Sequence, residues 1–386
     1  MTRVAVVGIG HSRFGRRTDV NLGELAFESI KQAIDDAGVD KKDINNVVVG
    51  SMGAWSEEAL PAVVVNEYAG LSGAGTMRVE AACASGSAAV KSAYNSIVSG
   101  EGNLALAVGV EKMTEVDSST SVELIGRAGS YFWEFENFGI TFPAYYALYA
   151  TAHMTKFGTT LEDLSRVAVK AHHYGALNPL AQFQKEITLE KAMDSQVVAW
   201  PLRLFDACPL TDGSAAVVLA SEEVARTLTD TPIWISGVGY SSDSANMSRR
   251  GDYVGLEAVV KAAKSAYAMA KVTPGDIDVA TAHDCFTIAE LMAYEDLGFC
   301  RKGEGAKMIR EGETELGGRI PINLDGGLKA KGHPIGATGV SMTVEITKQL
   351  RGEAGRHQAP IKNGVGLVHN VGGTGHYAYV TILSRS

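Results

Sequence analysis

Apolar residues near the start of the chain follow two different periods. Val4–Ile9 is a short continuous apolar run, typical of a buried strand, whereas positions 22–37 repeat apolar side chains at the three- and four-residue spacing of an amphipathic helix. Gly38 follows this helix, where a glycine commonly provides a left-handed C-cap. A second apolar run at Val47–Val49 predicts another strand, so the chain opens with a β-α-β unit.

The same order of elements recurs in the second half of the chain. Apolar runs at Pro232–Val238 and Val279–Ala282 predict strands, and Leu256–Ala270 predicts the helix between them. In each half a helix of small residues follows, and then another strand, at Leu104–Gly109 or near Gly366–His369. This repetition predicts an α/β fold of two duplicated halves with mostly parallel central strands.

A segment without this rhythm separates the two halves. Residues 116–199 are rich in aromatic side chains, and the patterns there predict helices at Ala144–Phe157 and Leu161–Leu177. Long insertions usually carry binding or oligomer contacts. The chain then returns to the first half through the strand Ala216–Ala220. We therefore expect an N-terminal half of residues 1–115 plus 200–225, an inserted loop domain of residues 116–199 with substrate or oligomer contacts, and a C-terminal half of residues 226–386.

Composition narrows the class of protein. Hydrophobic residues make up 46% and charged residues 20%, as in globular proteins, and the net charge of −9 argues against nucleic-acid binding. No apolar run has the length of a signal peptide or a membrane span, so we expect a cytoplasmic protein without a membrane partner. The four cysteines, Cys83, Cys208, Cys285 and Cys300, form no CxxC pair, so neither a zinc site nor a redox motif is predicted.

Cys83 is a candidate nucleophile, and His333 a candidate base. Cys83 lies in Glu80-Ala-Ala-Cys-Ala-Ser-Gly86, between an extended segment and a helix whose amides and dipole would favour the thiolate. His333 precedes Pro334, which is predicted to begin a helix, and a neutral imidazole there can accept a proton or donate to an oxyanion. The two segments correspond in the duplicated halves, so we expect them to face each other. The alternative is a buried cysteine at a tight helix contact and a capping histidine.

Two further loops carry chemical groups. His283-Asp-Cys-Phe286 follows a strand, where α/β folds place their sites, and Thr287 with Glu290 predicts a capping box for the next helix. The segment His369-Asn-Val-Gly-Gly-Thr-Gly375 offers backbone N–H groups for an oxyanion hole. Each loop taken alone has a plain structural explanation, as a cap, a filler or a turn.

Together these four segments, in this order, resemble the thiolase superfamily over essentially the whole chain, with the greatest similarity to archaeal acetoacetyl-CoA thiolases and sterol-carrier-protein-x thiolases. The resemblance implies an α/β thiolase fold, in which two βαβαβαββ halves form a layered α-β-α-β-α core with an inserted loop domain. The shared phrases include Val79-Glu-Ala-Ala-Cys-Ala-Ser-Gly86, Gly109-Val-Glu-Lys-Met-Thr114, Glu295-Asp-Leu-Gly-Phe-Cys300, Gly326-Gly-Leu-Lys-Ala-Lys-Gly-His-Pro334 and Asn370-Val-Gly-Gly-Thr-Gly375.

The resemblance also implies an activity, that of an acetyl-CoA C-acetyltransferase. In this acyltransferase Cys83 would form an acetyl-enzyme with the help of His333, and the enolate of a second acetyl-CoA would attack it, or the reverse thiolysis would run. His333 and a water near His283 would stabilise the enolate oxygen. The N–H groups of Cys83 and Gly372, beside Asn370, would hold the other oxyanion. Coenzyme A is then substrate and product, and no permanent cofactor or metal is implied.

The sequence departs from the better-known thiolases at Asn370, where they carry an acid/base cysteine. An amide cannot transfer protons in this way, so the resemblance assigns the role to Cys285, as in the sterol-carrier-protein-x type. Cys208 and Cys300 are interpreted as structural. Three alternatives stay open: a degradative 3-ketoacyl-CoA thiolase of the sterol-carrier-protein-x type, a condensing enzyme of the ketoacyl synthase type, and a non-catalytic acyl-CoA-binding scaffold subunit.

Partners are also implied only by the resemblance. It predicts a homo-oligomer, either a dimer or a tetramer, that supplies the mevalonate pathway. It further predicts a complex with HMG-CoA synthase through a small zinc-ribbon/OB-fold protein.

Overall fold

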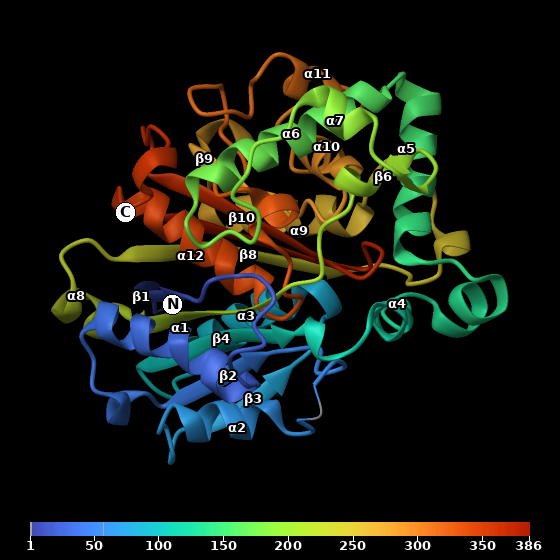
Figure 1. Cartoon of the computed structure of the whole chain (residues 1–386). Helices are drawn as coiled ribbons and strands as arrows, with labels where there is room; N and C mark the ends of the chain where they lie inside the picture. Colours follow the sequence, from blue (N-terminus) through green and yellow to red (C-terminus); the bar gives the residue numbers. More distant parts are fainter. Residues whose placement is uncertain (1, 57) are drawn as a thin grey trace.

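The computed structural model describes residues 2–56 and 58–386 (Figure 1). The two halves of the chain have similar series of strands and helices, but among the described residues the C-terminal half has no strand that corresponds to β3 and so departs there from the predicted βαβαβαββ order. The N-terminal half consists of β1 (Val4–His11), α1 (Leu22–Ala37), β2 (Asn46–Gly50), α2 (Pro61–Tyr68), β3 (Gly75–Val79), α3 (Ser85–Val98), β4 (Leu104–Lys112), β7 (Asp212–Ser221) and α8 (Glu222–Leu228). The C-terminal half consists of β8 (Ile233–Ser242), α9 (Glu257–Ala270), β9 (Val279–Thr281), α10 (Thr287–Asp296), α11 (Gly305–Arg310), α12 (Thr338–Arg351), β10 (Val365–Gly372) and β11 (Tyr377–Ser384).

The strands of both halves lie in one sheet, in the order β3-β2-β4-β7-β1-β8-β11-β10-β9. A short antiparallel ladder joins the halves, in which Ala5 pairs with Trp234 and Val6 with Ile233. β2 is parallel to β3 and β4, and β9 is parallel to β10, but β7 and β11 are antiparallel to both of their neighbours. The prediction of mostly parallel strands is therefore wrong for the last strand of each half. β11 follows β10 after a tight turn, and such a turn can join only antiparallel strands.

Helices cover the outer face of each half of the sheet, and two further helices lie between the two halves. α1 packs against β1 and β7, and α9 packs against β8 and β11. α3 and α12 contact each other, and they also contact strands of their own halves (Figure 1). This arrangement is the layered α-β-α-β-α core of the expected fold class.

Glycines allow α3 and α12 to cross with their backbones in contact. A Cβ atom added to Gly86 in α3 would lie 2.7 Å from the nitrogen of Gly339 in α12. A Cβ atom added to Gly339 would lie 2.2 Å from the nitrogen of Ser87. Because Cys83 immediately precedes α3 and His333 precedes α12, this crossing brings the two candidate residues together.

The inserted segment supplies helices next to the site. Its elements are α4 (Ser118–Gly126), a π-helix at Tyr131–Glu136, α5 (Phe142–Phe157), α6 (Leu161–Leu177), α7 (Leu189–Met193) and the hairpin of β5 (Val197–Ala199) and β6 (Leu202–Arg203). The two helices predicted here match α5 and α6, and the first predicted helix matches α1, which Gly38 ends with a φ of 64°. Within the described ranges, no helix is both long and apolar enough to cross a bilayer.

Candidate active site

Cys83 lies on a constrained turn between β3 and α3. It belongs to a short 3-10 helix, Ala82–Ala84, and Ala82 has a φ of 49°, in the left-handed region that non-glycine residues avoid. The hydroxyl of Ser85 donates to the Ala82 carbonyl at 2.7 Å and accepts the Ala81 N–H at 2.9 Å. The turn is therefore fixed by local hydrogen bonds, and it holds the thiol in one place.

Burial and backbone amides act in opposite directions on the pKa of the Cys83 thiol. Burial raises its pKa to about 12, although backbone N–H groups of Gly373 and of Cys83 itself act in the opposite direction. This rise in pKa opposes the expected stabilisation of a thiolate, because a few amides at a helix end do not replace the water that burial removes. The amides near the sulfur are that of Cys83 itself and that of Gly373, the residue after the predicted Gly372.

His333 carries its proton on the nitrogen that faces away from the reaction. Its Nδ1 lies 2.7 Å from the hydroxyl of Thr338, and that hydroxyl donates to the Pro334 carbonyl at 2.9 Å. The hydroxyl proton is thus used, so Nδ1 donates and Nε2 keeps a free lone pair. Nε2 has no hydrogen-bond partner among the described residues, and burial lowers the pKa of the imidazole to about 3. His333 is therefore a neutral base.

The helix predicted to begin at Pro334 begins at Thr338 instead. Pro334 opens a turn, whose carbonyl accepts the N–H groups of Ala337 and Thr338 at 2.9 and 3.0 Å. His333 lies ahead of this turn, and its own N–H donates to the Thr211 hydroxyl at 3.0 Å. The histidine is consequently positioned by Thr211 and Thr338 rather than by a helix end.

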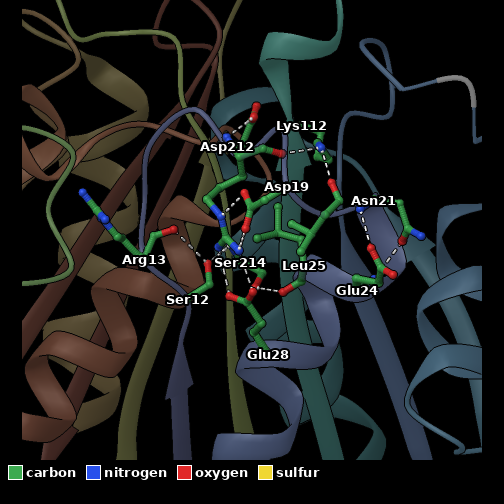
Figure 2. A network of polar contacts seen from close by, with 12 residues as sticks. Ser12, Arg13, Asp19, Asn21, Glu24, Leu25, Glu28, Lys112, Asp212 and Ser214 are labelled. Atoms are coloured by element: carbon green, nitrogen blue, oxygen red, sulfur yellow. Dashed lines mark hydrogen bonds and ion pairs between the residues drawn. The ribbon is translucent and has the colours of Figure 1, made fainter.

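A polar network surrounds Asp212, the residue after Thr211, and Figure 2 shows Asp212 and Lys112 within it. The carboxylate of Asp212 accepts the backbone N–H of Arg17 at 2.9 Å. The ammonium group of Lys112 donates to the Arg17 carbonyl at 2.7 Å. The ends of β4 and β7 are thereby tied to the loop after β1, which fixes the segment that contacts the histidine.

Glu111 connects the two halves behind the nucleophile. Its buried carboxylate accepts N–H groups from Met52 at 2.9 Å, Gly53 at 3.1 Å and Gly336 at 3.1 Å, and the Ser51 hydroxyl at 3.0 Å. Burial raises its pKa to about 7, and these donors oppose that shift. In the sequence, Glu111 stands out only as part of the phrase from Gly109 to Thr114 that resembles thiolases. A partner 225 positions away cannot be read from one sequence.

The structure brings the predicted residues together. The sulfur of Cys83 and one ring nitrogen each of His283 and His333 all lie within 4.8 Å of one another. The two imidazole rings meet edge to face, with 5.1 Å between their centroids. Asn370 in β10 contacts both Cys83 and His283. The arrangement combines a nucleophile, a base and a second imidazole.

Cys285 also lies at this site, and so does Cys208, for which the sequence indicated no chemical role. The phenol of Tyr146 in α5 lowers the pKa of the Cys285 thiol, but burial outweighs it and raises that pKa well above its usual value. The Tyr146 hydroxyl itself donates to the Gly373 carbonyl at 3.4 Å. Cys208 donates its backbone N–H to the Cys285 carbonyl at 2.9 Å and lines the same cavity as Cys83. Reading Cys208 as merely structural therefore missed that it forms part of the cavity wall. In the sequence, the only indication of this position is that Cys208 precedes Pro209 in a predicted turn.

The predicted capping box at Thr287 is absent. Thr287 is the first residue of α10 rather than its cap, and its hydroxyl donates to Asp206 at 2.8 Å. Glu290 pairs instead with the buried ammonium group of Lys170. These contacts attach α10 to the 206–210 segment and to α6.

A mainly apolar cavity of about 220 Å³ opens at the thiols. Helices α4 and α5 of the insertion form one wall, and the 207–210 segment forms another. Its lining includes Cys83, Cys208, Cys285, His333, Met113, Val122, Ile125, Phe142, Pro143, Leu210, Phe286 and Ile335. Such a cavity suits an acyl group on an extended thioester arm, with the thiols and His333 in its wall.

Comparison with known proteins agrees with this geometry. The family described as "Thiolase, N-terminal domain" matches residues 4–223, and "Thiolase C-terminal domain-like" matches residues 239–385. The chain belongs to the thiolase family. The predicted family and the predicted acyltransferase class are thereby confirmed.

Relatives of this thiolase cover its full length. An acetyl-CoA acetyltransferase from Methanothermobacter thermautotrophicus is 43% identical over 100% of both chains, and human sterol carrier protein 2 is 32% identical over 96% of this chain and 70% of its own. Among solved structures, an Ltp2-ChsH2(DUF35) aldolase has a TM-score of 0.86 and 28% identity, covering 99% of this chain and 98% of its own. Human mitochondrial 3-ketoacyl-CoA thiolase in complex with CoA shares the fold, with a TM-score of 0.76, 18% identity and coverage of 100% and 98%.

Proposed function

We propose that this thiolase is an acetyl-CoA C-acetyltransferase, which forms acetoacetyl-CoA from two acetyl-CoA or cleaves it with CoA. The observation that carries the proposal is the meeting of the Cys83 thiol with the free base of His333 in the wall of an apolar cavity. The full-length similarity to acetyl-CoA acetyltransferases supports the short acyl group. The similarity to sterol carrier protein 2 supports the alternative, a thiolase for longer chains.

The first half-reaction makes an acetyl-enzyme. His333 takes the proton of the Cys83 thiol as the sulfur attacks the thioester carbonyl, because neither group is charged at rest. The new bond joins the Cys83 sulfur to the acetyl carbon, and the bond between that carbon and the CoA sulfur breaks. The leaving thiolate takes its proton from Cys285, which leaves Cys285 anionic. The phenol of Tyr146, which lowers the pKa of this thiol, stabilises that anion when its hydroxyl turns from the Gly373 carbonyl toward the sulfur.

The second half-reaction forms the carbon–carbon bond. The Cys285 thiolate removes an α-proton from the second acetyl-CoA, and the resulting enolate attacks the acetyl group on Cys83. The bond between this acetyl carbon and the Cys83 sulfur breaks, and the protonated His333 returns its proton to the sulfur. Both thiols and the imidazole are then restored, so the cycle balances. While it is protonated, His333 also donates to the enolate oxygen, and each such donor contributes about 3 kcal/mol.

The oligomer and partners follow as further parts of the proposal. Strand β3 ends the sheet with an unpaired edge, and its Met77 side chain is half exposed, which supports association of two copies into a cytoplasmic homo-oligomer. The product would feed an HMG-CoA synthase in the mevalonate pathway. The similarity to the Ltp2-ChsH2(DUF35) aldolase supports a complex through a small zinc-ribbon/OB-fold protein.

Trapping of a labelled acetyl group tests the proposal. Cys83→Ala should take up no label from acetyl-CoA, whereas Cys285→Ala should still acylate but fail to form acetoacetyl-CoA. Cys300→Ala, which removes a thiol that does not line the cavity, is the matched control and should behave as the wild type. Stable label in the Cys83→Ala protein would overturn the assignment of the nucleophile.

Substrate choice separates the remaining alternatives. Cleavage of acetoacetyl-CoA in preference to a long-chain or sterol-derived 3-ketoacyl-CoA supports the acetyltransferase. The opposite preference supports the sterol-carrier-protein-x type. Folded protein that turns over neither, alone or with its partners, would be a scaffold subunit.

A further inference from the structure

The side-chain nitrogen of Asn370 contacts both the nucleophile segment and His283. It lies 3.0 Å from the Cys83 carbonyl oxygen and 3.1 Å from Nδ1 of His283. A carbonyl oxygen cannot donate, so the amide must turn its nitrogen toward Cys83. The second N–H of the same nitrogen then points to Nδ1 of His283. That ring nitrogen must carry a lone pair rather than a proton.

The proton of His283 is therefore on Nε2. Burial, with the neighbouring His333 and His369, lowers the pKa of His283 well below its usual value, so the ring is neutral and holds a single proton. The backbone N–H of His283 donates to His369 at 3.3 Å, which anchors the loop at the other end. The two site histidines thus have opposite tautomers. His333 presents a free lone pair at Nε2, and His283 keeps a proton on its Nε2.

The amide of Asn370 is not arranged for stability alone. Its oxygen is buried without a hydrogen-bond partner among the described residues, and such a loss costs about 1–3 kcal/mol. Gly339 leaves room for this oxygen, since a Cβ atom there would lie 2.4 Å from it. Turning the amide over would place its oxygen against the Cys83 carbonyl oxygen, where neither atom can donate. The side-chain nitrogen of Asn370 thus donates two hydrogen bonds, while its amide oxygen has no partner among the described residues.

We propose that Asn370 is a positioning residue that fixes the tautomer of His283, so that His283 donates a hydrogen bond to the substrate enolate oxygen and cannot act as a base. This inference rests on the proposed function. It assigns a use to the asparagine that replaces the acid/base cysteine of other thiolases. It also replaces the water expected near His283 by a direct N–H donor.

The isosteric variant Asn370→Asp reverses this arrangement. As a buried neutral acid, the introduced carboxyl group keeps a donor for the Cys83 carbonyl but turns an acceptor toward His283, which then takes its proton on Nδ1 and loses the Nε2 donor. We expect condensation to fall by about 10²–10³-fold, as when one oxyanion donor is removed. Acylation of Cys83, followed as the burst of free CoA, should stay near the wild-type rate because it uses His333. Asn103→Asp at an exposed position is the matched control.

Two independent measurements decide the matter. Neutron diffraction from wild-type crystals, or ¹⁵N NMR of histidine-labelled protein assigned with His283→Gln, reports the tautomer without any variant at Asn370. A proton on Nδ1 of wild-type His283 overturns the inference. So does wild-type condensation by a folded Asn370→Asp protein. Loss of the acylation burst in the wild type would contradict the proposed function itself, which keeps the two failures distinct.

Discussion

The contact between α3 and α12 can be tested by adding a single methyl group. In Gly86→Ala the new Cβ would lie 2.7 Å from the nitrogen of Gly339 and 2.8 Å from the oxygen of Gly336 and from the nitrogen of Val340. All three are backbone atoms, so relief requires a shift of several tenths of an ångström between the helices rather than a side-chain rotation. Overpacking of this kind costs about 1–3 kcal/mol, while the helix preference of alanine over glycine returns at most about 1 kcal/mol.

The catalytic effect should exceed the effect on stability. Cys83 and His333 are carried by the segments that lead into these two helices, and a displacement of about 1 Å between reacting groups can cost about 10²-fold in rate. We expect the acylation burst of Gly86→Ala to slow by about 10- to 100-fold, together with a lower midpoint of thermal unfolding. Gly251→Ala, where an added Cβ meets no atom within 4 Å, is the control. A Gly86→Ala protein with unchanged burst rate and midpoint would refute the reasoning.

Three further predictions concern protons and charges. Because burial raises the pKa of Cys83 to about 12, its alkylation by iodoacetamide should rise about tenfold per pH unit from pH 7 to 10, whereas a plateau near neutral pH would mean a thiolate. Thr338→Val removes the acceptor that holds the proton on Nδ1 of His333 and should slow acylation by about 5- to 150-fold with little change in KM for acetyl-CoA; an unchanged rate would contradict that role. Lys170→Met leaves the buried carboxylate of Glu290 without its cationic partner and should lower the free energy of unfolding by about 3–5 kcal/mol in urea titrations. The double variant Lys170→Met/Glu290→Gln removes both charges and should recover most of this loss.

The order of elements and the reacting groups could be read from the sequence. Periodicity predicted α1, α5 and α6 within two residues of their ends, because each buries one face at helical spacing. Resemblance to thiolases selected Cys83, Cys285, His283 and His333, and the structure gathers all four at one site. A chemical motif is defined by residue types and their order, and both can be read directly from one sequence.

Properties that depend on partners distant in the chain required the tertiary structure. The sequence suggested a thiolate at Cys83, yet burial by both halves raises the pKa of this thiol, since desolvation is set by everything packed around it. It placed a helix at Pro334 and a capping box at Thr287, but Thr338 and Asp206 take those hydrogen bonds in the folded chain. The chain by itself therefore determined which groups react. Only folding decided where their protons reside, because a proton follows its nearest acceptor in space rather than in sequence.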